Sequence, residues 1–219
     1  MIDQFTFPQF KDLVQTQLSQ PLPGQKAQFQ MAPLARQQPE MASVESKSCR
    51  EAAVLALFYP CSKGKAKLLL TVRPDAMKKH AGQVAFPGGR REPGESLSDT
   101  ALRETEEEIF VPGHTIELIG ELTPLYIPPS NFCVYPFVGF VDTRPDMNVT
   151  SEEVAAMFGV RAHELVLPEK RRFFPSNVAG QERNIPFFDF NGYQIWGATA
   201  MMMAELAAVI DPTLRQVEP

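Results

Sequence analysis

Residues 89–111 read GRREPGESLSDTALRETEEEIFV, and this stretch decides how the rest of the chain is interpreted. It predicts a helix over about 96–110. Residues in a helix advance by about 100° each, so Glu104, Glu107 and Glu108 fall on one face, one turn apart. Like charges three and four positions apart destabilise a helix by roughly 0.2–0.5 kcal/mol per pair. We therefore expect something outside the helix to neutralise this face.

A divalent cation is the natural partner for these carboxylates, because Mg²⁺ binds carboxylate oxygens and keeps positions free for waters and substrate phosphates. A glutamate-rich helix face is more often simply solvated. The preceding residues favour a site instead. Residues 86–89 (FPGG) predict a strand end and a flexible turn, 90–94 predict a loop, and Glu95 lies where the helix begins. Together these features predict a site for a metal-bound polyphosphate.

The spacing of this stretch, G-x5-E-x7-R-E-x-x-E-E-x-x-V, resembles the Nudix box of the Nudix hydrolases, which cleave a diphosphate linked to another moiety. The glycine and every charged position of that pattern are present, as Gly89, Glu95, Arg103, Glu104, Glu107 and Glu108. Two positions depart from it, since Thr105 replaces an aliphatic residue and Phe110 replaces glycine. Neither is a metal ligand in the family, so the departures concern packing at the helix end. The resemblance implies an α/β fold, a Nudix-type α/β/α sandwich with a central mixed β-sheet.

A second motif lies immediately before the first. Residues 69–89, LLTVRPDAMKKHAGQVAFPGG, predict a strand end, a basic loop and a return strand. The basic side chains of this loop are Arg73, Lys78, Lys79 and His80. They could hold phosphates, although a basic loop is more often a solvated surface. The run resembles the signature LLTxR-x4-R-x3-G-x3-FPGG of coenzyme A diphosphatases, except that Lys78 replaces arginine and Pro74 replaces a small residue.

The resemblance implies roles for the motif residues. The expected metal ligands are Glu104 and Glu108, joined by Glu107 and by a backbone carbonyl near Gly89, with Mg²⁺ or Mn²⁺ as the cofactor. Arg103 is expected to orient the Glu95 carboxylate. The expected substrate contacts are Arg73, Lys78, His80, Gly82, Phe86 and Gly88.

The general base is not fixed by the motif, because in this superfamily it varies and often lies in a later loop. Glu152 and Glu153 are the candidates, with Glu153 foremost, and exposed acidic residues without a role are an equally good interpretation. His80, His114 and His163 are weaker candidates, because a lone histidine is more often a surface or structural residue.

These parts favour metal-dependent hydrolysis of coenzyme A or its derivatives, giving 3′,5′-ADP and 4′-phosphopantetheine or its acyl form. A Nudix hydrolase of ADP-ribose, a dinucleotide polyphosphate or an oxidised nucleotide is the alternative within the enzyme class. A Nudix-fold regulator that binds a nucleotide without cleaving it is less favoured, because such proteins usually lose box glutamates. A scaffold without a small-molecule site fits poorly with the two motifs.

Composition sets the outer bounds. The 219 residues are 44% hydrophobic and 21% charged, as in ordinary soluble proteins. The net charge of −5 disfavours a nucleic-acid partner. No signal peptide is evident, and the longest apolar stretch, 195–210, carries Glu205 and is shorter than the roughly 20 residues that span a bilayer. An odd number of cysteines, expected as unreactive thiols, suits a reducing compartment, so we expect a cytoplasmic protein without a membrane partner. A homodimer stays open.

The rest of the chain predicts an N-terminal helix and extended arm (1–47), a main domain (48–212) and a tail (213–219). Expected helices lie at 8–19 and 198–210, with a helical turn at 162–166. Expected strands lie at 52–59, 67–72, 83–86, 115–122, 133–141, 154–160, 181–190 and 193–195, the last two joined at Asn191-Gly192 as a hairpin. Pro136 predicts an edge or a bulge for its strand.

Overall fold

The structure is a computed structural model that describes residues 2–32, 43–45, 47–74, 82–148, 151–178 and 181–216. Its strands are β1 (Arg50–Pro60), β2 (Ala66–Val72), β3 (Val84–Ala85), β4 (Gly88–Arg90), β5 (Glu117–Glu121), β6 (Leu125–Ile127), β7 (Phe132–Phe140), β8 (Ala156–Arg161), β9 (Arg171–Val178), β10 (Gln181–Phe190) and β11 (Tyr193–Trp196). Its helices are α1 (Phe7–Leu18), α2 (Gly24–Gln28), α3 (Leu97–Ile109) and α4 (Gly197–Ile210). Short 3-10 turns are η1 (Ile2–Gln4), η2 (Phe29–Met31), η5 (Gly113–Thr115), η6 (Ala162–Val166), η7 (Pro168–Lys170) and η8 (Pro212–Gln216).

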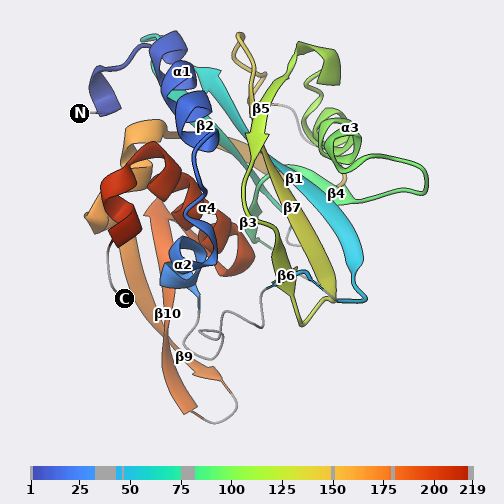
Figure 1. The fold of residues 1–219 in the computed structure, drawn as a ribbon, viewed down its shortest axis with the longest axis vertical. Helices are drawn as coiled ribbons and strands as arrows, with labels where there is room; N and C mark the ends of the chain where they lie inside the picture. The colour runs from blue at the N-terminus through green and yellow to red at the C-terminus, as the bar shows by residue number, and fades with distance from the viewer. Residues whose placement is uncertain are drawn as a thin grey trace.

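A central mixed sheet organises these elements (Figure 1). Its strand order is β3-β2-β1-β7-β5, with β4 paired to β1, β6 to β7 and β8 to β2. β1 and β7 run parallel, from Arg50 beside Phe132 to Phe58 beside Phe140. A smaller antiparallel sheet has the order β11-β10-β9. The predicted α/β fold with a mixed sheet and flanking helices is confirmed.

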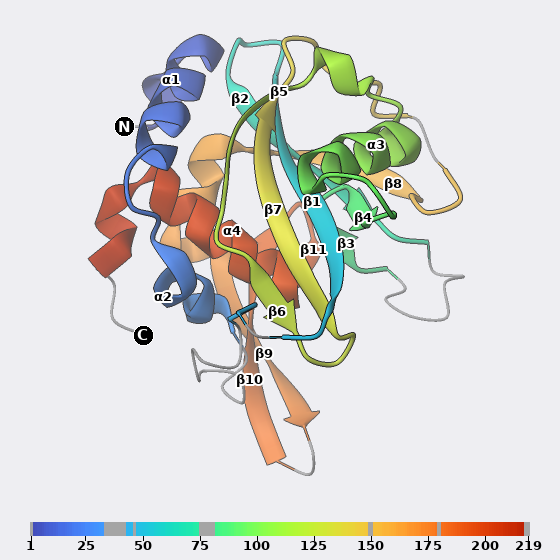
Figure 2. The same ribbon diagram turned by 45° about the vertical axis from the view of Figure 1, so that its right-hand side comes forward.

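β1 is buried on both faces, which explains its continuous apolar run. Ala53, Leu55 and Leu57 pack in the layer that contains Ala101 and Ile109 of α3. The alternate residues of β1 pack in the layer that contains α4 and α1. Figure 2 shows α3 on one side of β1 and α1, α2 and α4 on the other. The helix that bears the carboxylates is thus fixed against the middle of the sheet.

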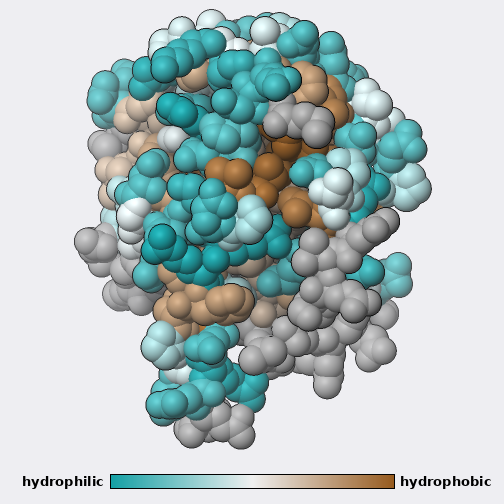
Figure 3. All heavy atoms as spheres, turned by 90° about the vertical axis from the view of Figure 1, so that its left-hand side faces the viewer, coloured by the Kyte–Doolittle hydropathy of each residue, from teal (hydrophilic) through white to brown (hydrophobic). Residues whose placement is uncertain are grey.

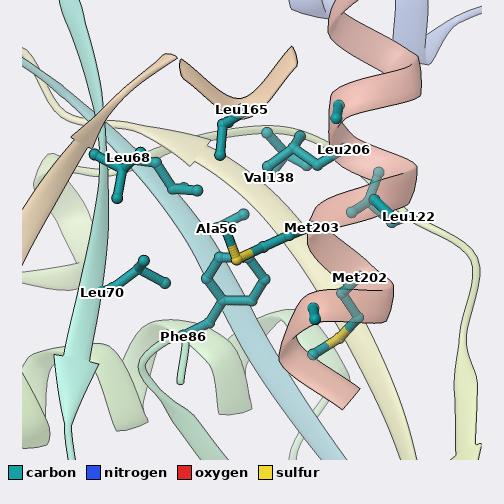
Figure 4. Packing of buried hydrophobic residues seen from close by; sticks show 14 of the residues in the cluster. Ala56, Leu68, Leu70, Phe86, Leu122, Val138, Leu165, Met202, Met203 and Leu206 are labelled. Carbon is teal, nitrogen blue, oxygen red and sulfur yellow. The ribbon is translucent and has the colours of Figure 1, made fainter. Parts of the chain in front are cut away.

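α4 is apolar around its whole circumference, because it is enclosed between the central sheet, the small sheet and the N-terminal helices. Met201, Met202 and Met203 are all buried, so the methionine run is core packing as predicted. In Figure 4 Met203 points toward Phe86 and Ala56. Among the residues that the structure describes, no helix is long and apolar enough to cross a membrane. The face shown in Figure 3 is mostly hydrophilic, with apolar atoms confined to limited areas.

Most predicted elements are present within one or two residues of their expected bounds, including the hairpin turn, where Asn191 and Gly192 have φ of 54° and 83°. Several elements were not predicted. The strands β4, β6 and β9 were missed, and part of the expected irregular arm forms α2 and η2. The turns η1, η5, η7 and η8 were not predicted either. The rest of that arm, residues 33–42 and 46, lies outside the described residues.

Pro136 predicted an edge or a bulge. The edge is wrong, because β7 lies between β1 and β5, but the β5–β7 pair does contain a bulge or irregularity. Pro136 lies beside Val54 in the parallel pair and accepts the Leu122 N–H, past the end of β5. A register shift in β5, between Leu118 and Gly120, interrupts the pairing nearby. The proline is tolerated where one partner strand ends and the next has not begun.

Two of the three cysteines are not thiols. Cys49 and Cys133 form a disulfide with a Cα–Cα distance of 5.7 Å, which corrects the expectation of three free thiols. Parallel pairing sets Cys133 beside Glu51, two residues after Cys49, and so brings the two cysteines together. Cys61 is free, as predicted.

Glu205 fastens the N-terminal segment to the domain. This carboxylate of α4 is fully buried. It accepts hydrogen bonds from Gly24 N (3.0 Å), Gln28 Nε2 (2.8 Å) and both N and Oγ1 of Thr123. Burial raises the pKa of Glu205, and these donors oppose that rise. α2 is therefore held by a buried polar network as well as by apolar packing.

Replacing Glu205 with alanine should destabilise the fold strongly, because several buried donors lose their acceptor. A buried unsatisfied donor costs about 1–3 kcal/mol. We therefore expect Glu205→Ala to lower the free energy of unfolding in urea by about 3 kcal/mol or more. Glu205→Gln, which retains one acceptor oxygen, should lose less. Equal stability of Glu205→Ala and wild type would contradict this role.

Candidate active site

α3 begins at a side-chain cap and is held to the sheet by its apolar face. Ser96 is the N-cap, and its Oγ accepts the Asp99 N–H at 3.1 Å. Thr105, one of the two departures from the box, is fully buried, and its hydroxyl donates to Ala101 O at 2.7 Å. A threonine is accommodated in this apolar layer because the backbone satisfies its hydroxyl.

The second departure introduces strain at the helix end. Phe110 is the C-cap and has φ 57° and ψ 29°, the left-handed conformation that favours glycine. Its side chain is 58% exposed, so little packing offsets the backbone cost. Below the cap, Gly113 N donates to Glu106 Oε2 at 2.9 Å, which turns this carboxylate toward the loop.

The two glycines of the FPGG turn let two carboxylates of α3 approach the main chain of β4. A Cβ atom on Gly89 would overlap the Glu104 carboxylate. Gly88 has φ +146°, and a Cβ atom there would overlap the Ala53 carbonyl oxygen. Gly88 N donates to Glu108 Oε2 at 3.1 Å. Position 88 therefore requires glycine, because a Cβ there would meet the main chain of β1, whereas a Cβ at Gly89 would displace the Glu104 carboxylate from its present position.

Arg103 connects the loop carboxylate to the helical ones, as predicted for Glu95. Its Nε donates to Glu95 Oε1 at 2.7 Å, and its NH1 donates to Glu104 Oε1 and Glu107 Oε2, both at 3.0 Å. Hydrogen bonding to Arg103 lowers the pKa of Glu95 to about 2. Glu95 is therefore an ionised positioning group at neutral pH.

The helical carboxylates differ in environment. Glu108 is 6% exposed, and burial raises its pKa to about 7. Burial also raises the pKa of Glu104, against the effect of Arg103. The Glu107 side chain is 60% exposed. Buried carboxylates that ionise with difficulty gain most from a cation placed against them.

Glu153 lies at this site. Arg73 follows β2 and Glu153 precedes β8, which pairs with β2, and Arg73 NH2 donates to Glu153 Oε2 at 3.1 Å. The charges of both residues act on the pKa of Glu108, Arg73 lowering it and Glu153 raising it. The strand pairing thus brings together a predicted substrate contact, the predicted base and a predicted metal ligand. The ion pair between Arg73 and Glu153 was not predicted.

Other predicted site residues lie elsewhere or outside the described region. Phe86 is buried in the core against α4, so it supports the glycine turn from beneath and is not placed to touch a substrate. Gly82 has φ +67° and its N–H donates to Arg73 O at 3.2 Å. His163 Nδ1 lies 3.2 Å from Asp3, on the N-terminal side of the molecule. Lys78, Lys79 and His80 lie outside the described residues.

A model of the NUDIX domain matches residues 50–178, more than half of the chain. The chain belongs to the Nudix family. It is a hydrolase that acts on a diphosphate bond. It is 34% identical over 176 residues to the Nudix hydrolase NudL of Yersinia enterocolitica, covering 80% of this chain and 88% of that one. It is 37% identical over 163 residues to NudL of Yersinia pestis, a match that covers 74% of this chain and 80% of that one. The solved structure of the MutT protein of Methanosarcina mazei Go1 is similar to this one with a TM-score of 0.48 and 19% sequence identity. The match covers 78% of this chain and 98% of that one.

Replacing Phe110 with glycine should stabilise this Nudix protein, because glycine adopts the left-handed conformation without a Cβ penalty. A side chain in that conformation costs roughly 1–2 kcal/mol. We expect Phe110→Gly to raise the free energy of unfolding by about 1 kcal/mol in urea denaturation. Phe110→Ala, which keeps the Cβ, serves as the control and should not gain. A less stable Phe110→Gly would mean that the exposed ring makes a contact that offsets the strain.

Metal-free stability should depend on pH through Glu108. The pKa of this carboxyl is about 7 in the fold against 4.5 when exposed, so its charge penalises the folded state above pH 7. That penalty is relieved as the pH falls through 7 toward 4.5. We expect Glu108→Gln to be more stable than wild type at pH 8 by on the order of 2–3 kcal/mol, and nearly equal to it at pH 4.5. Urea unfolding in a chelator at both pH values measures the difference, and a gain that is the same at both would exclude the titration.

Proposed function

We propose that this Nudix hydrolase cleaves the diphosphate of coenzyme A or its derivatives, giving 3′,5′-ADP and 4′-phosphopantetheine or its acyl form. The observation that carries the proposal is the continuity of the two motifs, residues 69–89 and 89–111. The first resembles the coenzyme A diphosphatase signature and ends at the Gly89 that begins the second. Arg73, from the first motif, lies in the electrostatic environment of Glu108, from the second.

The carboxylates fit a hard divalent cation. Among the described residues no three His, Cys, Asp or Glu side chains are already gathered as a metal site. Arg103 donates hydrogen bonds to Glu104 and Glu107 instead. The environment nevertheless suits a cation, because Glu104 and Glu108 are partly desolvated and both lie against the main chain of β4. We assign Glu104, Glu107 and Glu108 as the side chains that would hold Mg²⁺ or Mn²⁺, together with a carbonyl near Gly89. The bound cation supplies neutralisation of the diphosphate and a more acidic water.

The chain's own residues then position and receive the reacting groups. Arg103 and Glu95 keep the ligand carboxylates in place by hydrogen bonds. Arg73 is oriented by Glu153 and presents a guanidinium that suits a phosphate oxygen. Glu153 is the proposed general base, which takes a proton from the attacking water. Its ion pair with Arg73 holds it beside the carboxylate face.

The family admits other substrates, and we keep ADP-ribose, dinucleotide polyphosphates and oxidised nucleotides as the alternative for this site. A non-cleaving regulator is disfavoured because all the box carboxylates are present. The substrate is expected to be a nucleotide-type small molecule. The cytoplasmic location and the possible homodimer stay predictions from sequence.

Coenzyme A should be split by the purified protein with Mg²⁺ or Mn²⁺, with 3′,5′-ADP and 4′-phosphopantetheine identified by mass. Glu107→Gln should lower kcat by roughly 100-fold, because it removes a metal ligand from an exposed position without disturbing the core. Glu106→Gln is the matched control, since it lies on the same helix but faces Gly113, and it should stay within about twofold of wild type. Intact coenzyme A alongside cleavage of ADP-ribose or a dinucleotide would reject the proposed substrate.

A further inference from the structure

Arg91 occupies a position at which the Nudix box accepts any residue. Its backbone and its guanidinium are nevertheless both held by hydrogen bonds. Its backbone N–H donates to Glu51 O at 3.0 Å, and its NH1 donates to Glu51 Oε2 at 2.6 Å. Its Nε donates to Glu95 O at 2.6 Å. One guanidinium therefore joins the sheet strand β1 to the backbone of the loop that carries Glu95.

The loop that carries Glu95 is held to α3 by Thr100 and Arg103, which both donate to the Glu95 carboxylate, and to the sheet by Arg91. Residues 91–96 connect β4 to α3 without regular structure, and Gly94 has φ +84°. Within the loop, Glu95 N donates to Glu92 O at 3.3 Å and Glu92 N donates to Glu95 Oε2 at 3.1 Å. These bonds hold the loop to itself, whereas Arg91 holds it to the sheet.

From Glu95 the connection continues to the carboxylates of α3. Glu95 binds Arg103, and Arg103 donates to Glu104 and Glu107. A displacement of the Glu95 backbone would move the guanidinium that orients both ligand carboxylates. Small displacements of positioning groups lower catalytic rates far more than they lower stability.

We propose that Arg91, held by Glu51, is a positioning residue that sets the metal affinity of the site through Glu95 and Arg103. This inference rests on the proposed function, because it assumes that Glu104 and Glu107 hold the cation. The pair is too exposed to be a major source of fold stability, with side chains 36% and 37% exposed. Its effect should therefore appear at the metal site and not in the melting temperature.

The test is direct titration with Mn²⁺ by calorimetry, which needs no substrate. Arg91→Ala should weaken Mn²⁺ binding by several-fold to about tenfold, at or below the effect expected for a group that contacts a ligand directly, because Arg91 acts through Glu95 and Arg103. Its melting temperature should stay close to that of wild type. Arg50→Ala is the matched control, since Arg50 lies on β1 next to Glu51 and, like Arg91, donates to a loop carbonyl, Ser130 O at 2.6 Å, away from α3. Its Mn²⁺ affinity should equal that of wild type.

Two further variants separate positioning from a general effect on the fold. Glu51→Ala should weaken Mn²⁺ binding several-fold, and Glu51→Gln should restore it to within about twofold, because an amide oxygen still accepts from Arg91. In a Glu95→Ala background, Arg91→Ala should change the affinity by less than about twofold, because residue 95 then has no side-chain acceptor for Arg103 and the connection is already broken.

The proposal is overturned if Arg91→Ala binds Mn²⁺ as tightly as wild type. It is also overturned if the loss is undiminished in the Glu95→Ala background, or if Arg50→Ala loses as much. A wild-type protein that binds no Mn²⁺ would overturn both this inference and the metal-dependent function. A protein that binds Mn²⁺ but leaves coenzyme A intact would overturn only the substrate assignment.

Discussion

The close approach of two carboxylates to the main chain of β4 is the constraint on which this site depends. Glu104 lies where a Cβ atom on Gly89 would be, and Glu108 accepts the Gly88 N–H. This approach requires α3 to lie tightly against β1 and β4, and it removes the carboxylates from water. The same packing raises the pKa of Glu108, so the charged form of this carboxylate is penalised in the fold. The packing of α3 and the electrostatics of its carboxylates therefore meet at Gly88 and Gly89.

The electrostatic repulsion among the carboxylates of α3 is reduced by residues of the helix and of the preceding loop. The positive charge of Arg103 offsets the negative charges of Glu95, Glu104 and Glu107, to all of which it donates hydrogen bonds. Glu95 in turn holds the guanidinium in place. The loop carboxylate thus completes the charge balance of a helix face that would repel itself in isolation. On the opposite side of the sheet, α4 needs no such compensation, because its one acidic residue, Glu205, is met by main-chain and side-chain donors of the N-terminal segment.

The sequence was sufficient for the features that are encoded locally. Hydrophobic periodicity and turn residues predicted the positions of α3, β1, β2 and the hairpin at Asn191. The motif predicted the pairing of Arg103 with Glu95. Features that depend on long-range pairing were not predictable. The position of β7 inside the sheet overrode the signal from Pro136, and the parallel register set Cys133 beside Glu51 and so brought it to Cys49. The motif predicted that Phe86 contacts the substrate. Its burial against α4 shows instead that it packs in the core and supports the glycine turn.

The bond between Cys49 and Cys133 has a topological consequence for the active site. It closes a covalent ring, with a sequence separation of 84, that contains both motifs and the whole of α3. When oxidised, the chain cannot fully extend on unfolding, and closing a ring of this size removes about 4–5 kcal/mol of chain entropy from the unfolded ensemble. A single backbone break inside the ring would leave its two ends tethered. Both motifs thus lie within a covalent ring that closes beside the first residues of β1.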